Sequence, residues 1–141
     1  MEGEYLVRDA SETQALGQSF AAVVAAPAVI HLQGDLGAGK TTFIQGMVRG
    51  LGTDVAVLSP TYTLVEEYTT EKGRVHHLDL YRIGGPEEVE SLGLRDRCGP
   101  EDIVLIEWPD RGGQAVPIPT WKVSLEYLDT GRSVSIANTR E

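Results

Sequence analysis

The sequence predicts an α/β fold, and three observations lead to this prediction. Segments with helical periodicity alternate with strand-like segments along the chain, which is the order typical of α/β proteins. Two short apolar runs, residues 28–32 and 103–106, have the composition of strands buried inside a parallel sheet. The length of 141 residues and the hydrophobic content of 41% suit one core. Because no repeat, linker or low-complexity stretch divides the sequence, we expect residues 1–141 to form a single domain.

The N-terminal part predicts a strand, a helix and a second strand. Residues 4–7 have the composition of a short strand. Ser11, with Gln14 three residues later, forms a capping-box pattern for the start of the helix, which ends before Pro27. The apolar stripe of this helix comprises Leu16, Phe20, Val23 and Val24. The buried strand at residues 28–32 then leads into a glycine-rich loop.

A second helix follows the glycine-rich loop and ends near Gly50 and Gly52. Its inward positions are Phe43, Ile44, Met47, Val48 and Leu51. Beyond it, residues 63–68 and 74–80 predict two strands, joined as a hairpin across residues 71–73.

The C-terminal part predicts one more helix and three more strands. Proline at the first turn favours a short acidic helix over residues 86–92. The buried strand at residues 103–106 is followed by a polar loop over residues 109–119. Residues 121–127 alternate between apolar and polar side chains, as in a half-buried strand, and a turn at residues 129–132 leads into the last strand.

The charge balance argues against a nucleic-acid-binding protein. The chain carries 12 basic and 21 acidic residues, for a net charge of −9. Nucleic-acid binding draws most of its affinity from neutralised phosphates, so we expect no strong direct binding to RNA or DNA. An acidic surface either docks on a basic protein partner or only keeps the chain soluble, and composition leaves both interpretations open.

The sequence predicts a cytoplasmic protein with no membrane association. No apolar run approaches the ~20 residues of a membrane span, and the N-terminus lacks the basic-then-apolar order of a signal peptide. The single cysteine, Cys98, excludes an internal disulfide, which fits a reducing compartment. Its neighbours Gly99 and Pro100 indicate a loop, and we interpret the thiol as structural rather than nucleophilic.

The glycine-rich loop matches the full phosphate-loop pattern G-x-x-x-x-G-K-T between a predicted strand and a predicted helix. Glycines let successive backbone N–H groups curl around phosphates, and the helix N-terminus adds a partial positive charge. Lys40 can reach the β- and γ-phosphates, and the Thr41 hydroxyl can ligate Mg²⁺. The residues predicted here to bind ATP or GTP are Gly34, Asp35, Leu36, Gly37, Ala38, Gly39, Lys40, Thr41 and Thr42.

A phosphate loop requires a second carboxylate to hold Mg²⁺, usually at the end of a neighbouring strand. Glu107 directly follows the apolar run 103–106, and Asp79 follows the weaker run 75–78. We favour Glu107 as the metal ligand and Asp79 as the residue that orients water or a metal-bound water. A solvated acid at the end of a strand is the alternative for either residue alone.

Four other residues lie in or beside these motifs. His76 and His77 are adjacent, so in a strand they point to opposite faces and cannot share one metal. A structural or hydrogen-bonding role is favoured for each. Trp108 belongs either beside the nucleotide or in the core, and Arg82 is either a charge-stabilising group or, as we favour, a surface arginine.

Together these motifs resemble the TsaE (YjeE) family, small bacterial ATPases required for threonylcarbamoyladenosine (t6A) modification of tRNA. The matching segments occur in the family's order. They are residues 34–42 (GDLGAGKTT), 59–64 (SPTYTL), 77–82 (HLDLYR) and 106–108 (IEW). Each short motif apart from the phosphate loop is weak alone, whereas four in sequence are a specific match.

The resemblance implies a P-loop NTPase domain with a mostly parallel sheet, antiparallel additions and helices on both faces. It implies ATP as the nucleotide, Mg²⁺ held by Thr41 and Glu107, and a catalytically required Asp79, with Lys40 and Glu107 also in the catalytic set. The segment 59–63 is implied to be a switch-like loop near the γ-phosphate. Further nucleotide contacts are implied for Ser11, Thr61 and Arg132.

The resemblance also implies two protein partners: TsaD, which transfers the threonylcarbamoyl group, and its companion TsaB. ATP hydrolysis, slow in the isolated chain and stimulated by the partners, would reset their complex between turnovers. The chain would not modify tRNA itself, which agrees with its acidic charge.

Three other functions compete with this interpretation. A small-molecule kinase would add an arginine-bearing lid, for which Arg95 and Arg97 offer only a short segment. A GTPase switch would use Asn-Lys-x-Asp, and the only asparagine is Asn138, near the end of the sequence. A subunit that binds nucleotide without hydrolysis is disfavoured by Asp79 and Glu107.

Overall fold

The structure is a computed structural model that describes residues 1–35, 37–53, 57 and 64–139. Leu36 and the predicted segment 59–63, with Thr61, lie outside the described residues. The strands are β1 (Gly3–Val7), β2 (Ala28–Gln33), β3 (Val65–Thr70), β4 (Gly73–Asp79), β5 (Asp102–Glu107), β6 (Trp121–Leu128) and β7 (Gly131–Asn138). The helices are α1 (Ala10–Ala21), α2 (Lys40–Gly50), α3 (Pro86–Ser91) and the 3₁₀ helices η1 (Leu94–Arg97) and η2 (Pro109–Ala115).

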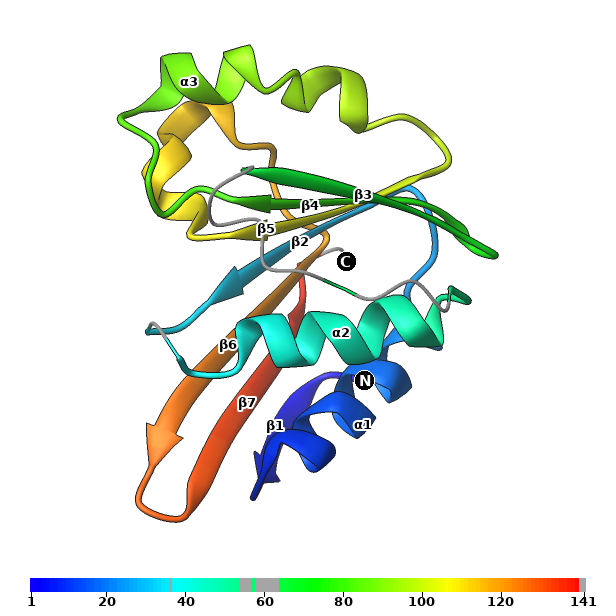
Figure 1. Ribbon diagram of the computed structural model, residues 1–141, viewed down its shortest axis with the longest axis vertical. Coiled ribbons are helices and arrows are strands. Elements are labelled where there is room, and N and C mark those ends of the chain that lie inside the picture. The colour runs from blue at the N-terminus through cyan, green and yellow to red at the C-terminus, as the bar shows by residue number, and fades with distance from the viewer. Residues whose placement is uncertain (36, 54–56, 58–63, 140–141) are drawn as a thin grey trace.

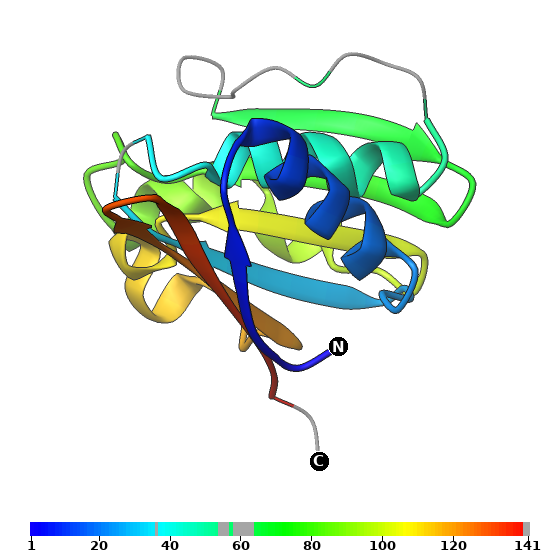
Figure 2. The same cartoon turned by 90° about the horizontal axis from the view of Figure 1, so that it is seen from below.

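The seven strands form one sheet in the order β1-β7-β6-β2-β5-β4-β3. Its four central strands, β6, β2, β5 and β4, are parallel to one another. β3 pairs antiparallel with β4, β7 with β6, and β1 with β7. β1 therefore runs in the direction of the central strands, and Figure 2 shows β1 and β7 lying steeply across β2 and β5 because the sheet twists. The predicted mostly parallel sheet with antiparallel additions is confirmed.

Strands β4 and β5 are buried on both faces along most of their length, which explains the continuous apolar run of β5, whereas β6 has one exposed face, as its alternating sequence predicts. Along β5, Ile103 and Leu105 face the core beneath α1 and α2, whereas Val104 and Ile106 face the core beneath α3. Figure 1 shows these two helical layers on opposite sides of the sheet. The predicted placement of helices on both faces is confirmed.

Helices α1 and α2 touch backbone to backbone. A Cβ atom on Gly17 of α1 would lie 2.2 Å from the Phe43 carbonyl oxygen, and one on Gly46 of α2 would lie 2.0 Å from the Gln14 carbonyl oxygen. Only glycine fits at either position. The two helices lie side by side in both views (Figures 1 and 2).

The predicted start of the first helix at Ser11 is wrong. Asp9 is the N-cap, and its carboxylate accepts a hydrogen bond from the Glu12 backbone N–H at 2.9 Å. Asp9 and Glu12 have the same three-residue spacing as a capping box, and an anionic cap is favoured by the helix dipole. Ser11 is an exposed residue inside α1. The predicted stripe also extends too far, because α1 ends at Ala21 and Val23 is 48% exposed.

Two other predicted boundaries differ from the structure. The segment 109–119, predicted as a loop, contains η2, which begins with a proline in its first turn and has a non-helical residue at Gly113. The hairpin strands β3 and β4 are Val65–Thr70 and Gly73–Asp79, so the turn is tighter than predicted. Among the described residues, no helix is long and apolar enough to span a membrane.

Candidate nucleotide site

Three neighbouring parallel strands end together at one edge of the sheet. In the register of β2 and β5, Leu32 pairs with Glu107. In the register of β4 and β5, Asp79 pairs with Glu107. The glycine-rich loop leaves β2 just beyond Leu32, so the fold brings this loop and both predicted carboxylates to the same edge. Ligands of open α/β sheets bind at such carboxyl ends.

The glycine-rich loop takes a conformation that its glycines make possible. Gly37 has φ +78°, and a Cβ atom there would lie 2.6 Å from the Tyr127 hydroxyl oxygen. Gly39, with φ +107°, is the N-cap of α2, and the helix begins at Lys40. The unpaired N–H groups of the first turn of α2 therefore adjoin the loop, which is the geometry of an anion-binding site.

Lys40 is buried at the centre of the site, with 5% of its surface exposed. Its ammonium group donates hydrogen bonds to the carbonyl oxygens of Gly34 and, at 3.2 Å, Asp35. Burial lowers the pKa of the Lys40 ammonium, while the negative charges of Glu107 and Asp79 act in the opposite direction. The side chain is thus held in place, partly desolvated and close to both carboxylates.

The two carboxylates are nearly inaccessible to solvent. Asp79 is 6% exposed and Glu107 is 4% exposed. Asp79 Oδ1 accepts a hydrogen bond from the Tyr81 backbone N–H at 3.0 Å. Glu107 Oε2 accepts one from His77 Nε2 at 2.6 Å. Burial raises the pKa of the Asp79 carboxyl, and repulsion from Glu107 adds to this effect.

Trp108 lies beside the glycine-rich loop and also packs against the core beneath α3. The Lys40 ammonium lies 4.3 Å from the Trp108 ring centroid, and the Tyr81 ring centroid lies 4.9 Å from it. Trp108 therefore packs against the core, and its predicted place beside the nucleotide stays a prediction. Arg82 is exposed, as expected for a surface arginine. The Arg111 guanidinium lies over the Tyr81 ring at 5.1 Å, a contact that no local sequence signal predicts.

A pocket of about 170 Å³ adjoins the outer side of the glycine-rich loop. Its lining comprises Arg8, Asp9, Ala10, Thr13, Gly37, Ala38, Gly39, Thr42 and Arg132. The predicted Arg132 is present, and its guanidinium lies 4.1 Å from the centroid of the Tyr127 ring. The predicted Ser11 is not part of the lining. The contributions of Arg8, Thr13 and Tyr127 depend on how α1 and the β6–β7 hairpin approach the loop, so sequence reasoning missed them.

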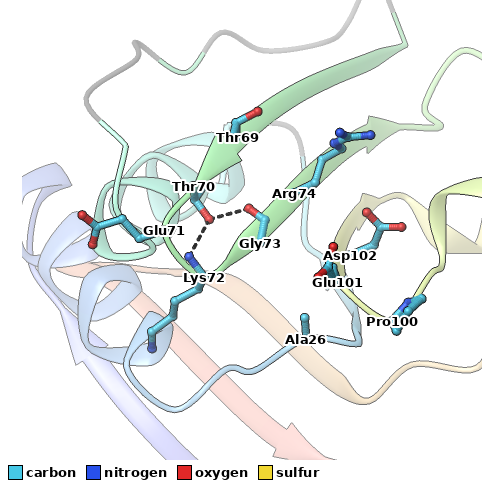
Figure 3. Close-up of a pocket in the computed structure, with 10 residues that line it drawn as sticks. All are labelled: Ala26, Thr69, Thr70, Glu71, Lys72, Gly73, Arg74, Pro100, Glu101 and Asp102. Atoms are coloured by element: carbon cyan, nitrogen blue, oxygen red, sulfur yellow. Dashed lines mark hydrogen bonds between the residues drawn. The ribbon is translucent and has the colours of Figure 1, made fainter.

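A larger pocket, of about 570 Å³, lies at the opposite edge of the sheet (Figure 3). It is formed by the β3–β4 turn with the adjoining strand ends, by residues 100–102 at the start of β5, and by Ala26. It lies at the amino ends of the parallel strands, away from the glycine-rich loop. Its Asp102 carboxylate already accepts hydrogen bonds from His76 and the Gly99 N–H. Size alone does not make this pocket the candidate site.

The sequence model of the family described as "Threonylcarbamoyl adenosine biosynthesis protein TsaE" matches residues 7–134 of this chain. This chain belongs to the TsaE family. The resemblance drawn from the four motifs is confirmed.

Relatives named tRNA threonylcarbamoyladenosine biosynthesis protein TsaE match most of the chain. The protein from Haemophilus influenzae is 44% identical over 108 residues, covering 77% of this chain and 68% of its own. The protein from Nostoc sp. is 46% identical over 127 residues, covering 87% of this chain and 77% of its own. The crystal structure of YdiB from Bacillus subtilis superimposes with a TM-score of 0.83 at 27% identity, covering 99% of this chain and 87% of that one. Membership of the TsaE family, with its P-loop NTPase fold, indicates a nucleotide-binding protein.

The raised pKa of Asp79 predicts a pH-dependent stability difference between the TsaE-family chain and its Asp79→Asn variant. A raised pKa means that the folded state binds the proton more tightly, so the protonated carboxyl stabilises the fold at low pH. This stabilisation is lost as pH rises from the ordinary carboxyl pKa through the raised one. Asp79→Asn should therefore increase the free energy of unfolding at pH 7.5, by about 0.5–2 kcal/mol, and by less at pH 4.5.

Urea denaturation of both proteins at several pH values measures this difference. Asp129→Asn, in the exposed β6–β7 turn, is the matched control and should show no such trend. An Asp79→Asn variant that is less stable than the parent at pH 7.5 would contradict the prediction.

Proposed function

We propose that residues 1–141 form one P-loop ATPase domain that binds ATP with Mg²⁺ and hydrolyses it in support of t6A modification of tRNA. The chain acts in the cytoplasm on a transferase complex of TsaD and TsaB type rather than on tRNA directly. The observation that carries this proposal is the meeting of a buried Lys40 with Asp79 and Glu107 beside a phosphate-loop backbone. The names of the relatives support the tRNA pathway.

The phosphates and the base are assigned to adjoining parts of the site. Residues 34–42 supply backbone N–H groups and the Lys40 ammonium to the phosphates. Lys40 exchanges its carbonyl acceptors for phosphate oxygens of higher charge. The pocket that contains Arg132 adjoins the loop on the side of α1, and we assign the nucleoside to it. Ser11, which lies outside its lining, and Thr61 stay further predicted contacts.

The residues at the sheet edge fit Mg²⁺. A hydroxyl from Thr41, in the first turn of α2, and a carboxylate from Glu107 are the hard oxygen ligands that Mg²⁺ prefers. Among the described residues, no group of three or more His, Cys, Asp or Glu side chains forms an all-protein metal site. Two ligands are in keeping with an ion that retains waters and binds phosphate oxygens. When bound, Mg²⁺ neutralises charge on the β- and γ-phosphates.

Asp79 is the residue that we assign to orienting the attacking water. Its carboxylate is fixed by the Tyr81 N–H and lies one strand beyond Glu107. Burial keeps bulk water from competing for its oxygens. Hydrolysis by such a site depends on the positioning of water and on charge stabilisation.

The arrangement of η1 favours an ATPase over a small-molecule kinase. Arg97, one of the two arginines available for a kinase lid, donates to the Leu92 carbonyl oxygen at 3.0 Å and forms an ion pair with Glu67 at 3.2 Å. It also contacts His76, which faces away from Asp79 and Glu107. Arg97 is therefore engaged away from the phosphate loop.

The test is a phosphate-release assay with and without the TsaD and TsaB proteins of the same organism. We expect slow turnover by the isolated chain and a marked increase with the partners, because supplying a missing group in trans raises P-loop hydrolysis by ~10³–10⁵-fold in other systems. With a net charge of −9, stimulation by a basic surface should weaken as salt rises. Turnover near the roughly 10 per second of ordinary enzymes without partners, and no change with them, would reject the proposal.

A further inference from the structure

We propose that His77 is a positioning residue that holds the Glu107 carboxylate in the orientation required for Mg²⁺ binding. This inference rests on the nucleotide function proposed above. It assigns a role to a buried histidine that is not part of the lining of the flanking pocket.

The contact between His77 and Glu107 is short and sealed from solvent. His77 is 0% exposed, and its Nε2 lies 2.6 Å from Glu107 Oε2. An ionised carboxylate only accepts hydrogen bonds, so Nε2 carries the proton and donates it. Charge-assisted bonds of this kind are stronger than neutral ones. The bond restricts the rotation of the Glu107 carboxylate, so the carboxylate that would hold Mg²⁺ is kept in one orientation.

The second ring nitrogen of His77 shows that the residue is costly as a core side chain. Within the part of the chain that the structure describes, His77 Nδ1 is buried and has no hydrogen-bond partner. Buried polar atoms are normally paired, because an unpaired one loses its hydration without replacement. A leucine would fill similar space without this cost. The contribution of His77 is therefore its bond to Glu107 rather than its packing.

A buried carboxylate next to a second carboxylate needs such a partner. Glu107 is 4% exposed and pairs in register with Asp79, whose charge repels it. Without the His77 donor, rotation of the Glu107 carboxylate away from Asp79 or toward water would lower its free energy. Residues that orient a metal ligand in this way typically change metal affinity 10–100-fold when they are replaced.

The same strand supplies a matched control. His76 is also buried, at 3% exposed, and its Nε2 lies 2.9 Å from a carboxylate oxygen of Asp102. Its ring points to the opposite face of the sheet, where it contacts Arg97. Replacing His76 removes a buried histidine–carboxylate contact from β4 without touching Glu107.

The experiment measures the affinity of a non-hydrolysable ATP analogue by calorimetry as Mg²⁺ is titrated, and again in EDTA. We expect His77→Leu to raise the Mg²⁺ concentration for half-maximal effect 10–100-fold and to leave affinity in EDTA within twofold of the parent. His77→Gln, whose amide nitrogen can occupy the place of Nε2, should recover most of the Mg²⁺ dependence. His77→Asn, whose amide is too short to reach Oε2, should behave like His77→Leu. His76→Leu should not shift the Mg²⁺ dependence.

Three results would overturn the positioning role. The first is an unchanged Mg²⁺ dependence in both His77→Leu and His77→Asn. The second is an equal shift of the half-maximal Mg²⁺ concentration in His77→Gln and His77→Asn. The third is an equal loss of analogue affinity by His77→Leu in Mg²⁺ and in EDTA. If His77→Leu does not fold, the comparison of His77→Gln with His77→Asn makes the same test. If the analogue affinity of the parent chain does not depend on Mg²⁺, the proposed function itself is overturned. This result distinguishes failure of the proposed function from failure of the positioning role.

Discussion

Replacing Lys40 by alanine should weaken ATP binding by about tenfold to hundredfold. The ammonium group is buried at the phosphate loop, and the other two lysines, Lys72 and Lys122, lie elsewhere in the chain. The loss of one charge-assisted contact to a phosphate costs roughly 1.5–3 kcal/mol, which corresponds to that range. Lys40 also ties the carbonyl oxygens of Gly34 and Asp35 together, so part of the loss comes from a loosened loop.

Calorimetric titration with ATP and Mg²⁺ measures this effect. Lys122→Ala removes the same charge from an exposed position on β6 and should leave affinity unchanged. Lys40→Met keeps the apolar stem and separates the loss of charge from the loss of packing. Unchanged ATP affinity in a folded Lys40→Met protein would reject the assignment of the phosphate site.

Glu107→Gln and Asp79→Asn should fail in different ways, although the two residues are neighbours in register. Glutamine at position 107 removes an anionic ligand, so the gain in ATP affinity on adding Mg²⁺ should largely disappear. Asparagine at position 79 should leave binding within a few-fold and slow hydrolysis by about a hundredfold or more, as expected for the loss of a carboxylate that orients the attacking water.

The two variants are compared by calorimetry with and without Mg²⁺ and by phosphate release in the presence of partners. Glu126→Gln, on the exposed face of β6, controls for the loss of one negative charge. If Asp79→Asn abolishes the Mg²⁺ effect while Glu107→Gln retains it, the roles of the two carboxylates are the reverse of those proposed.

The elements that the sequence predicts correctly are those with a strong local pattern. The apolar run 103–106 and the inward stripe of α2 are buried as expected, because burial on both faces of a strand and on one face of a helix leaves a distinct periodicity. The start of α1 was mispredicted because Asp9–Glu12 and Ser11–Gln14 present the same spacing. The spacing does not distinguish the two candidate N-caps, whereas the negative charge of Asp9 favours it at a helix N-terminus.

The phosphate loop and its two carboxylates were predictable because each lies at a strand end with its own signal. The bond from His77 to Glu107 depends on the register between β4 and β5, and register is not visible in one sequence. Tyr127 reaches the loop from a hairpin 90 residues further along the chain than Gly37. Such contacts are consequences of tertiary packing.

The glycine contact between α1 and α2 divides the site into two mechanical parts. The flanking pocket includes the start of α1, and the phosphate loop precedes the start of α2. The backbones meet at Gly17 and Gly46 with no room for a side chain. The starts of α1 and α2 are therefore held at a fixed separation. Asp79 and Glu107 belong to the sheet and are not part of this contact. A displacement between helices and sheet would therefore change the distance of the two carboxylates from the start of α2, while the start of α1 and the start of α2 keep their separation.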